Sequence, residues 1–245
     1  MIEGDPSGYE SLPNINVVKI DGNNVNDETL TVIIGDSSEK TFYNCNLETC
    51  SSLFSPNFEL MDLYNNISEW LTVISYHKVS TKNFKDLHLS YLPDYTKSDL
   101  QGSNLMTIQY GGKYTDHALV IEVEVEFIQQ YVISEIEQVL REKRVKFHTF
   151  TGYGSRLLKP MLFVDNPFQA FNQWMWGHAV FIKDITGYKK LSEEKLYKLS
   201  QIAHNVYSSY DLSAHCLSII DNRIGSNLVK RYLSSIKEVK YEVDE

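Results

Sequence analysis

The chain has 245 residues, enough for one sizeable α/β domain or two small ones, and 42% of them are hydrophobic, enough for a substantial core. A net charge of −9 disfavours binding to a nucleic-acid backbone, and the densest basic run, REKRVK at 141–146, is typical of the solvated end of a helix. No apolar run is long enough to cross a bilayer, so we expect no membrane span.

The cysteines and the N-terminus indicate a compartment. Cys45, Cys50 and Cys216 are odd in number and form no CxxC pair, and no histidine follows them at zinc-finger spacing. Free thiols fit a reducing environment, and MIEGDPSGYE is too acidic and polar for a signal peptide. We therefore expect a cytoplasmic protein, and we assign no metal ligand.

Short apolar runs rich in β-branched residues predict strands in the first half of the chain. The expected strands are 17–20, 30–34, 40–45, 72–79 and, most clearly, HALVIEVEVEF at 117–127. Helical spacing of apolar residues predicts helices over 58–71, where Asn65-Asn66 weakens the pattern, and over 127–143.

The second half of the chain predicts two further strands and a helical tail. The strands are expected at 146–154 and 178–184, with an aromatic connection that contains Trp174 and Trp176. Ser192 can cap a helix with a long apolar stripe, and Asp211 and Ser226 can cap two shorter ones. We predict a mostly parallel α/β domain over 1–190, a helical segment over 191–238 packed on it, and a disordered tail over 239–245.

One unusual stretch, YTKSDLQGSNL at 95–105, places charge where a strand meets a helix. In open parallel sheets, ligands bind outside the carboxyl ends of the strands, so Asp99 and Gln101 are candidates for ligand contact. The alternative is that Asp99 caps a helix that begins near Gln101.

A second candidate is the acidic face of IEVEVEF. Glu122, Glu124 and Glu126 alternate and therefore share one face of a strand. Either this is the wet face of an edge strand, or Glu124 and Glu126 reach a cleft, where they accept a proton, bind a polar substrate or hold a cation. His178 is a candidate base, with a packed or surface histidine as the alternative.

Taken in order, these stretches resemble the FkbM family of S-adenosylmethionine-dependent methyltransferases. The likeness runs over about residues 1–233, and its most specific parts are D-x-x-K-x-D-x-Q-G at 94–102, VEVEF at 123–127 and the C-terminal helical segment. The resemblance implies a class I methyltransferase-like (Rossmann-like) α/β fold, with a mostly parallel sheet and helices on both faces.

The resemblance also implies a cofactor site. Glu3 would end the second strand of such a fold and bind the ribose hydroxyls, and Asp36 would contact the adenine. Asp99 would lie beside the reacting methyl group, with Gln101 facing the same cleft.

The chain departs from the family pattern in several places. Asn104 stands where the family has a final Glu, the strand at 95–98 is unusually polar, the segment after VEVEF is short, and nothing before Glu3 matches the first strand and Gly-rich turn. We therefore expect an N-terminally truncated fold, with a mis-called start, a second chain that supplies the missing piece, or a shortened relative as the explanations.

The function implied is transfer of methyl from S-adenosylmethionine to a hydroxyl of a sugar or other small metabolite. Glu124, Glu126 and His178 are the candidate bases, and the aromatic stretch 163–178 either lines the acceptor site or belongs to the core. The rival hypothesis is a non-catalytic binding or interaction protein with a degenerate methyltransferase fold, favoured by the missing turn and by Asn104.

Overall fold

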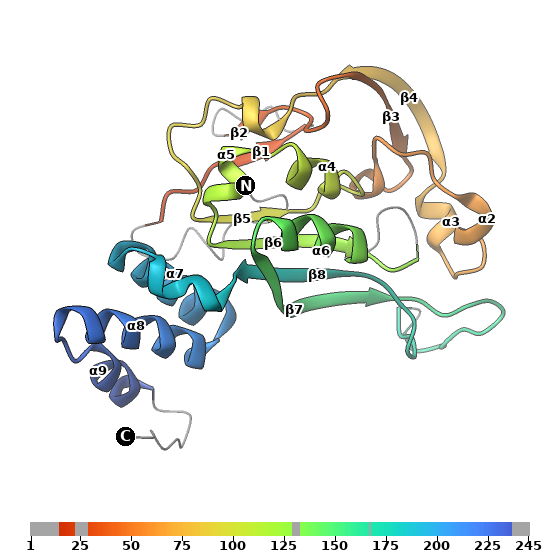
Figure 1. Cartoon of the computed structure of the whole chain (residues 1–245). Coiled ribbons are helices and arrows are strands. Elements are labelled where there is room, and N and C mark those ends of the chain that lie inside the picture. The colour runs from red at the N-terminus through yellow and green to blue at the C-terminus, as the bar shows by residue number, and fades with distance from the viewer. Residues whose placement is uncertain (1–14, 23–28, 129–132, 167, 237–245) are drawn as a thin grey trace. The chain divides into compact units, whose positions relative to one another are not determined.

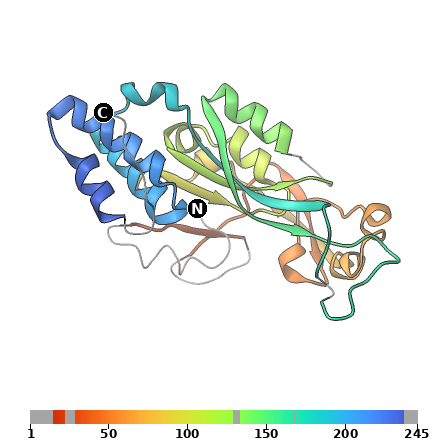
Figure 2. The same ribbon diagram turned by 90° about the horizontal axis from the view of Figure 1, so that it is seen from below.

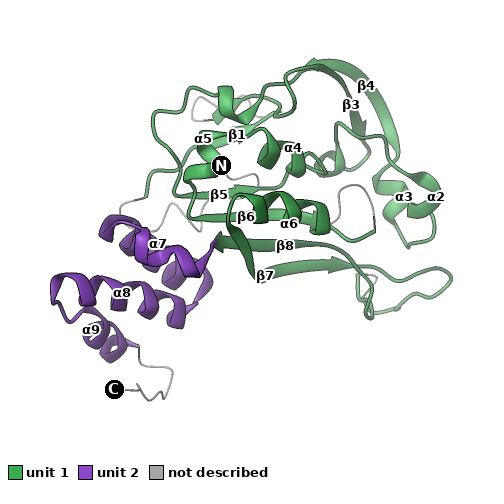
Figure 3. Cartoon of the chain, in the orientation of Figure 1, with its two compact units in different colours: residues 1–182 green, residues 183–245 purple. Residues whose placement is uncertain are grey.

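The computed structural model describes residues 15–22, 29–128, 133–166 and 168–236, and these form two compact units (Figures 1 and 3). The first unit is Met1–Ile182 and the second is Lys183–Glu245. The predicted Glu3 and the predicted tail at 239–245 lie outside the described residues.

The first unit contains all of the described strands and several short helices. The strands are β1 (Lys19–Asp21), β2 (Thr29–Thr31), β3 (Glu39–Cys45), β4 (Val73–Ser80), β5 (Tyr95–Ser98), β6 (Val120–Glu126), β7 (Val145–Ser155) and β8 (Trp174–Lys183). The helices are η1 (Glu48–Cys50), α2 (Phe58–Met61), α3 (Ile67–Trp70), η2 (Phe84–Asp86), α4 (Asn104–Gln109), α5 (Lys113–His117) and α6 (Ile133–Glu142).

The largest sheet has the strand order β5-β6-β8-β7. β5 and β6 are parallel, whereas β6 and β8 are antiparallel, with Glu124 directly opposite His178. Figure 1 shows β7 and β8 running in opposite directions, so the chain returns along β8 and enters the sheet beside β6.

The α/β prediction is confirmed, but the sheets are small and mixed rather than mostly parallel. Parallel neighbours need a long crossover connection, and the described residues between β7 and β8 form no helix that could serve as one. The two remaining sheets hold two strands each: β1 and β2 are parallel, and β3 and β4 are antiparallel.

The main core lies on one face of the largest sheet. The alternation of β6 turns Ile121, Val123 and Val125 to this face, where all three are fully buried against α4 and α6. Ile136 and Leu140 are four residues apart on α6 and supply its buried stripe. Seen from below, α4 and α6 lie side by side on the same face of the strands (Figure 2).

Because β6 is a central strand, its acidic residues are not on a wet edge. Glu122 is 3% exposed and Glu124 is 7% exposed, so the edge-strand alternative is wrong. The carboxylates of β6 occupy the face opposite the apolar core, where each needs a specific partner or a cavity.

Some predicted elements differ in length. The expected helix over 58–71 is broken into α2 and α3, because Asn66 takes a left-handed conformation (φ 66°) that interrupts the helical backbone. β8 begins four residues before the predicted strand, so Trp174 and Trp176 belong to the strand and not to a connection. The expected strand at 30–34 ends at Thr31, and Ile34 makes an isolated parallel bridge to Lys82.

The second unit is helical, with η3 (Ile185–Lys190), α7 (Glu193–Tyr207), α8 (Tyr210–Ile224) and α9 (Leu228–Ser235). Ser192 caps α7 as predicted, accepting a hydrogen bond from the Lys195 amide. Asp211 lies inside α8 instead of capping it, and Ser226 hydrogen-bonds Asp221, whose carboxylate accepts the first amides of α9.

Across the residues that the structure describes, we find no helix with the length and apolar character that a membrane crossing requires.

Candidate functional site

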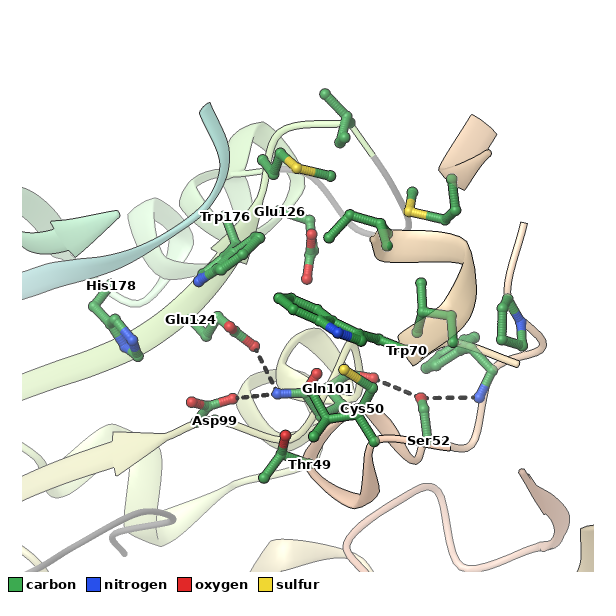
Figure 4. A pocket seen from close by; sticks show the side chains of 18 residues that line it. Thr49, Cys50, Ser52, Trp70, Asp99, Gln101, Glu124, Glu126, Trp176 and His178 are labelled. Carbon is green, nitrogen blue, oxygen red and sulfur yellow. Dashed lines mark hydrogen bonds between the residues drawn. The ribbon is translucent and has the colours of Figure 1, made fainter. Parts of the chain in front are cut away.

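A cavity of about 340 Å³ opens where β5 and β6 end. Asp99 is the first residue after β5, Glu126 is the last residue of β6, and Glu124 precedes it on the same face. His178 lies opposite Glu124 on β8. We call this hollow the acidic cavity, because Asp99, Glu124 and Glu126 line it together with His178 and Gln101 (Figure 4).

The turn after β5 holds Gln101 between two carboxylates. Gln101 Nε2 donates to Asp99 Oδ1 at 2.9 Å and to Glu124 Oε2 at 3.5 Å (Figure 4). Its backbone has a positive φ of 45°, a sparsely populated conformation for a residue with a side chain, and Gly102 follows with φ 93°. The backbone is therefore strained at Gln101, the residue whose side chain faces the cavity.

A serine from a distant segment anchors the same turn. Ser52 Oγ donates to the Gln101 carbonyl at 2.6 Å and accepts from the Phe54 amide at 3.1 Å. Ser52 is 7% exposed, so the bond is shielded from water. The alternative in which Asp99 caps a helix is wrong, because α4 begins at Asn104, and no side chain caps it.

Asn104 departs from the family pattern and has a structural role here. Its side-chain oxygen accepts hydrogen bonds from Ser98 Oγ at 2.5 Å and from the Leu100 amide at 3.2 Å. The residue is 3% exposed, so it fixes the turn from inside and does not reach the cavity.

Glu122 lies on the same strand face but does not line the acidic cavity. Lys97 Nζ lies 3.4 Å from its Oε1, and the Tyr95 hydroxyl donates to Oε2 at 2.9 Å. Thr151 Oγ1 adds a hydrogen bond of 3.3 Å. Lys97, part of the motif at 94–102, therefore neutralises a buried glutamate.

The cavity shifts the pKa of the groups that face it. Burial, and secondarily the charge of Asp99, raises the pKa of Glu126 from 4.5 to about 8. Burial, followed by the neighbouring Cys45, raises the pKa of the Cys50 thiol to about 11. The carboxyl of Glu126 and the thiol of Cys50 therefore favour their protonated, neutral forms unless a positive charge enters the cavity.

An aromatic wall closes the other side of the cavity. Trp70 from α3 and Trp176 from β8 line it, with Met175 and Ile67 beside them. The Arg156 guanidinium lies over both indole rings, 5.0 Å and 5.2 Å from their centroids, and over Phe168 at 5.1 Å. Part of the aromatic stretch 163–178 therefore lines the cavity, through Met175, Trp176 and His178.

A second hollow of about 380 Å³ adjoins the first, and we call it the adjoining cavity. The two cavities share four wall residues: Thr49, Ser52, Asp99 and Gln101. Apolar side chains of Val32, Ile33 and Phe42 line the adjoining cavity, and Asp21 and Glu48 are its other acidic residues.

The structure brings most predicted site residues together, but not all of them. Asp99, Gln101, Glu124, Glu126 and His178 line one cavity. Asp36 does not line either cavity, and its carboxylate instead binds Lys40 at 2.7 Å. Lys40 and then Ser38 lower the pKa of Asp36 to about 2, which marks a paired surface group.

Sequence reasoning missed several wall residues. Asp21 ends a strand and is followed by Gly22, a pattern that was visible in the sequence and that often marks a ligand hydroxyl site. Cys50 and Trp70 carried no such signal, because nothing in their local sequence shows that they line a cavity with Asp99.

Comparisons of this chain with protein-family models, with curated proteins and with solved structures gave no match.

Proposed function

We propose that the chain binds S-adenosylmethionine in the adjoining cavity and transfers its methyl group to a hydroxyl of a small acceptor in the acidic cavity. The observation that carries the proposal is that two hollows, each of ligand size, meet at one carboxylate, Asp99. A two-substrate transfer needs this layout, because both partners must meet at one point with their reacting atoms aligned.

The walls of the adjoining cavity fit a nucleoside. Val32, Ile33 and Phe42 offer an apolar surface for a base. Asp21 at the end of β1 is the acidic residue placed to accept hydrogen bonds from ribose hydroxyls, in the role expected of Glu3. This revises the expected contacts, since Asp36 points to Lys40 instead.

The charge of the shared wall fits the donor end of the cofactor. When bound, S-adenosylmethionine supplies a methyl group on a positively charged sulfur, whose bond to carbon breaks as the acceptor oxygen bonds to that carbon. Asp99 lies in the wall common to both cavities, where its carboxylate attracts this charge. Gln101 Nε2 holds Asp99 in place from its strained turn.

The acidic cavity fits a hydroxylated acceptor. Trp70 and Trp176 present ring surfaces on which a sugar or similar metabolite packs. Glu124, Glu126 and His178 are the candidate bases for the hydroxyl proton, and Glu126 can accept it only once it has lost its own proton, near its raised pKa of about 8. The strand order adds support, since β5 and β6 are parallel and their carboxyl ends open onto this site, the place where nucleotide-binding α/β sheets hold their ligands.

Calorimetry with S-adenosylmethionine tests the cofactor site. We expect binding by the wild-type chain, a loss of at least tenfold in Asp21→Asn and Asp99→Ala, and no change in the matched surface variant Asp36→Asn. A chain that does not bind the cofactor, or whose affinity changes only in Asp36→Asn, would contradict the proposal. Incubation with methyl-labelled cofactor and a panel of hydroxylated acceptors then separates transfer from binding alone, the rival function.

A further inference from the structure

Three side chains of the acidic cavity are arranged as a set of metal ligands. One carboxylate oxygen each from Asp99 and Glu124 and one ring nitrogen of His178 all lie within 4.8 Å of one another. Ligand atoms that are each 2.0–2.6 Å from one ion cannot be more than about 5 Å apart, so a single ion fits between these three.

The backbone fixes the three residues in this arrangement. Glu124 and His178 are directly paired across β6 and β8, so their side chains leave the same face of the sheet side by side. Ser98 pairs with Val123, and this register places the next residue, Asp99, beside Glu124. Sites built on strands hold their ligands more precisely than sites on loops.

The charge around the three residues favours a cation. Asp99, Glu124 and Glu126 line the cavity, and no Lys or Arg is among its described wall residues. Arg156 lies over the indole rings of Trp70 and Trp176, and Lys97 binds Glu122. Glu124 is buried and Asp99 and Glu126 are half-buried, so a positive ion between them would offset their mutual repulsion.

A histidine atom in the site points to the same conclusion. His178 Nδ1 is buried and has no hydrogen-bond partner within the described parts of the chain. A buried polar atom without a partner is uncommon, and an ion bound to this nitrogen would satisfy it. The imidazole also separates this set from a purely acidic cluster, since nitrogen ligands suit transition metals.

We propose that Asp99, Glu124 and His178 bind a divalent first-row metal ion. Two carboxylates and one imidazole suit ions such as Mn²⁺ that accept both oxygen and nitrogen ligands. Three protein ligands leave coordination positions open toward the cavity, as in catalytic metal sites. Under the proposed function, Glu124 and His178 would then hold the ion and leave Glu126 as the candidate base, and the acceptor hydroxyl would bind at an open position and lose its proton more readily. Ion binding itself does not depend on methyl transfer.

Titration with Mn²⁺ alone, followed by the electron paramagnetic resonance signal of the free ion, tests the site. We expect the wild-type chain to bind Mn²⁺, and His178→Gln and Asp99→Asn to weaken binding at least tenfold, since even outer-shell partners contribute 10–100-fold. His117→Gln is the matched control, because His117 Nε2 lies 3.4 Å from Asp94 Oδ1 at the other end of β5. That variant should bind the ion like the wild type.

The inference is wrong if the wild type leaves Mn²⁺ free at millimolar concentrations, or if neither His178→Gln nor Asp99→Asn weakens binding. Thermal melts of each variant separate loss of the site from loss of the fold, and either variant suffices if the other does not fold. Cofactor calorimetry in the presence of a chelator reports on the proposed function separately. Cofactor binding without Mn²⁺ binding overturns only the metal site, and the reverse result overturns only the cofactor site.

Discussion

Glu122 and Glu124 are two residues apart on one face of one strand, yet their surroundings are opposite. Glu122 has Lys97 at 3.4 Å and hydroxyl groups of Tyr95 and Thr151 around it. Glu124 lies opposite His178, near Asp99 and Gln101, in a cavity whose described walls contain no Lys or Arg. The comparison teaches that a buried carboxylate marks a candidate ligand site where it faces a cavity together with other acidic groups.

Removing the ion pair between Lys97 and Glu122 should have the largest effect on stability. Lys97→Met leaves the carboxylate of Glu122 buried without a countercharge, so we expect the free energy of unfolding to fall by about 3 kcal/mol. Urea denaturation measures the change. The double variant with Glu122→Gln should recover part of the loss, and Arg141→Met, which removes an exposed pair with Glu137, should cost under about 0.5 kcal/mol. If the Lys97→Met chain were as stable as the wild type, Lys97 would not stabilise Glu122, and the contrast between Glu122 and Glu124 would not hold.

The acidic cavity should make stability depend on pH. The folded chain raises the pKa of Glu126 from 4.5 to about 8, mainly through burial, so between these values it keeps a proton that the unfolded chain has released. The free energy of unfolding should therefore decrease as pH rises from 5 to 8, by up to about 1.4 kcal/mol per pH unit. Unfolding of metal-free wild type and Glu126→Gln across this range isolates the effect. The prediction is wrong if both chains show the same slope.

Substitution of Glu124 itself should change stability little. Glu124→Gln removes one of three neighbouring carboxylates in the metal-free protein, so we expect a change within about 1 kcal/mol, toward greater stability. Glu122→Gln, two residues away on the same strand face, should destabilise instead, because it removes the ion pair with Lys97. Thermal melts of the two variants give a direct comparison, and equal losses in both would contradict it.

The rate at which the Cys50 thiol is alkylated reports on the cavity and involves no change in stability. Because burial raises the pKa of its thiol to about 11, alkylation at pH 8 should be about a hundredfold slower than that of an exposed thiol. Any compound that fills the cavity should slow the reaction further, and mass spectrometry locates the label. Fast labelling that no ligand slows would place Cys50 outside the binding site.

Much of the fold could be predicted from the sequence, because local patterns determine single elements. The alternation of 117–127 predicted β6, and the apolar spacing after Ser192 predicted α7. The direction and pairing of β8 could not be predicted, since they depend on how the long connection after β7 returns the chain to the sheet. That return produced a mixed sheet where a mostly parallel one was expected.

For the candidate site too, the sequence predicted the residues that local patterns mark, but not those that strand pairing and tertiary packing bring in. Asp99, Gln101, Glu124 and Glu126 share an edge because parallel strands end together. The pairing of His178 with Glu124 depends on strand register, which a short sequence does not specify. Trp70 reaches the acidic cavity only through tertiary packing, so no local pattern could have placed it there, whereas the strand end at Asp21-Gly22 was visible in the sequence.

The hydrogen bond from Ser52 to Gln101 spans 49 positions of the chain. Closing so long a loop costs entropy that no local contact repays, so this bond is expected to form late during refolding. A proteolytic fragment that keeps β5 to β8 would retain the acidic residues but lose the wall that Ser52 and Trp70 complete. During refolding, the capacity to bind a ligand should therefore appear after the helical signal has recovered.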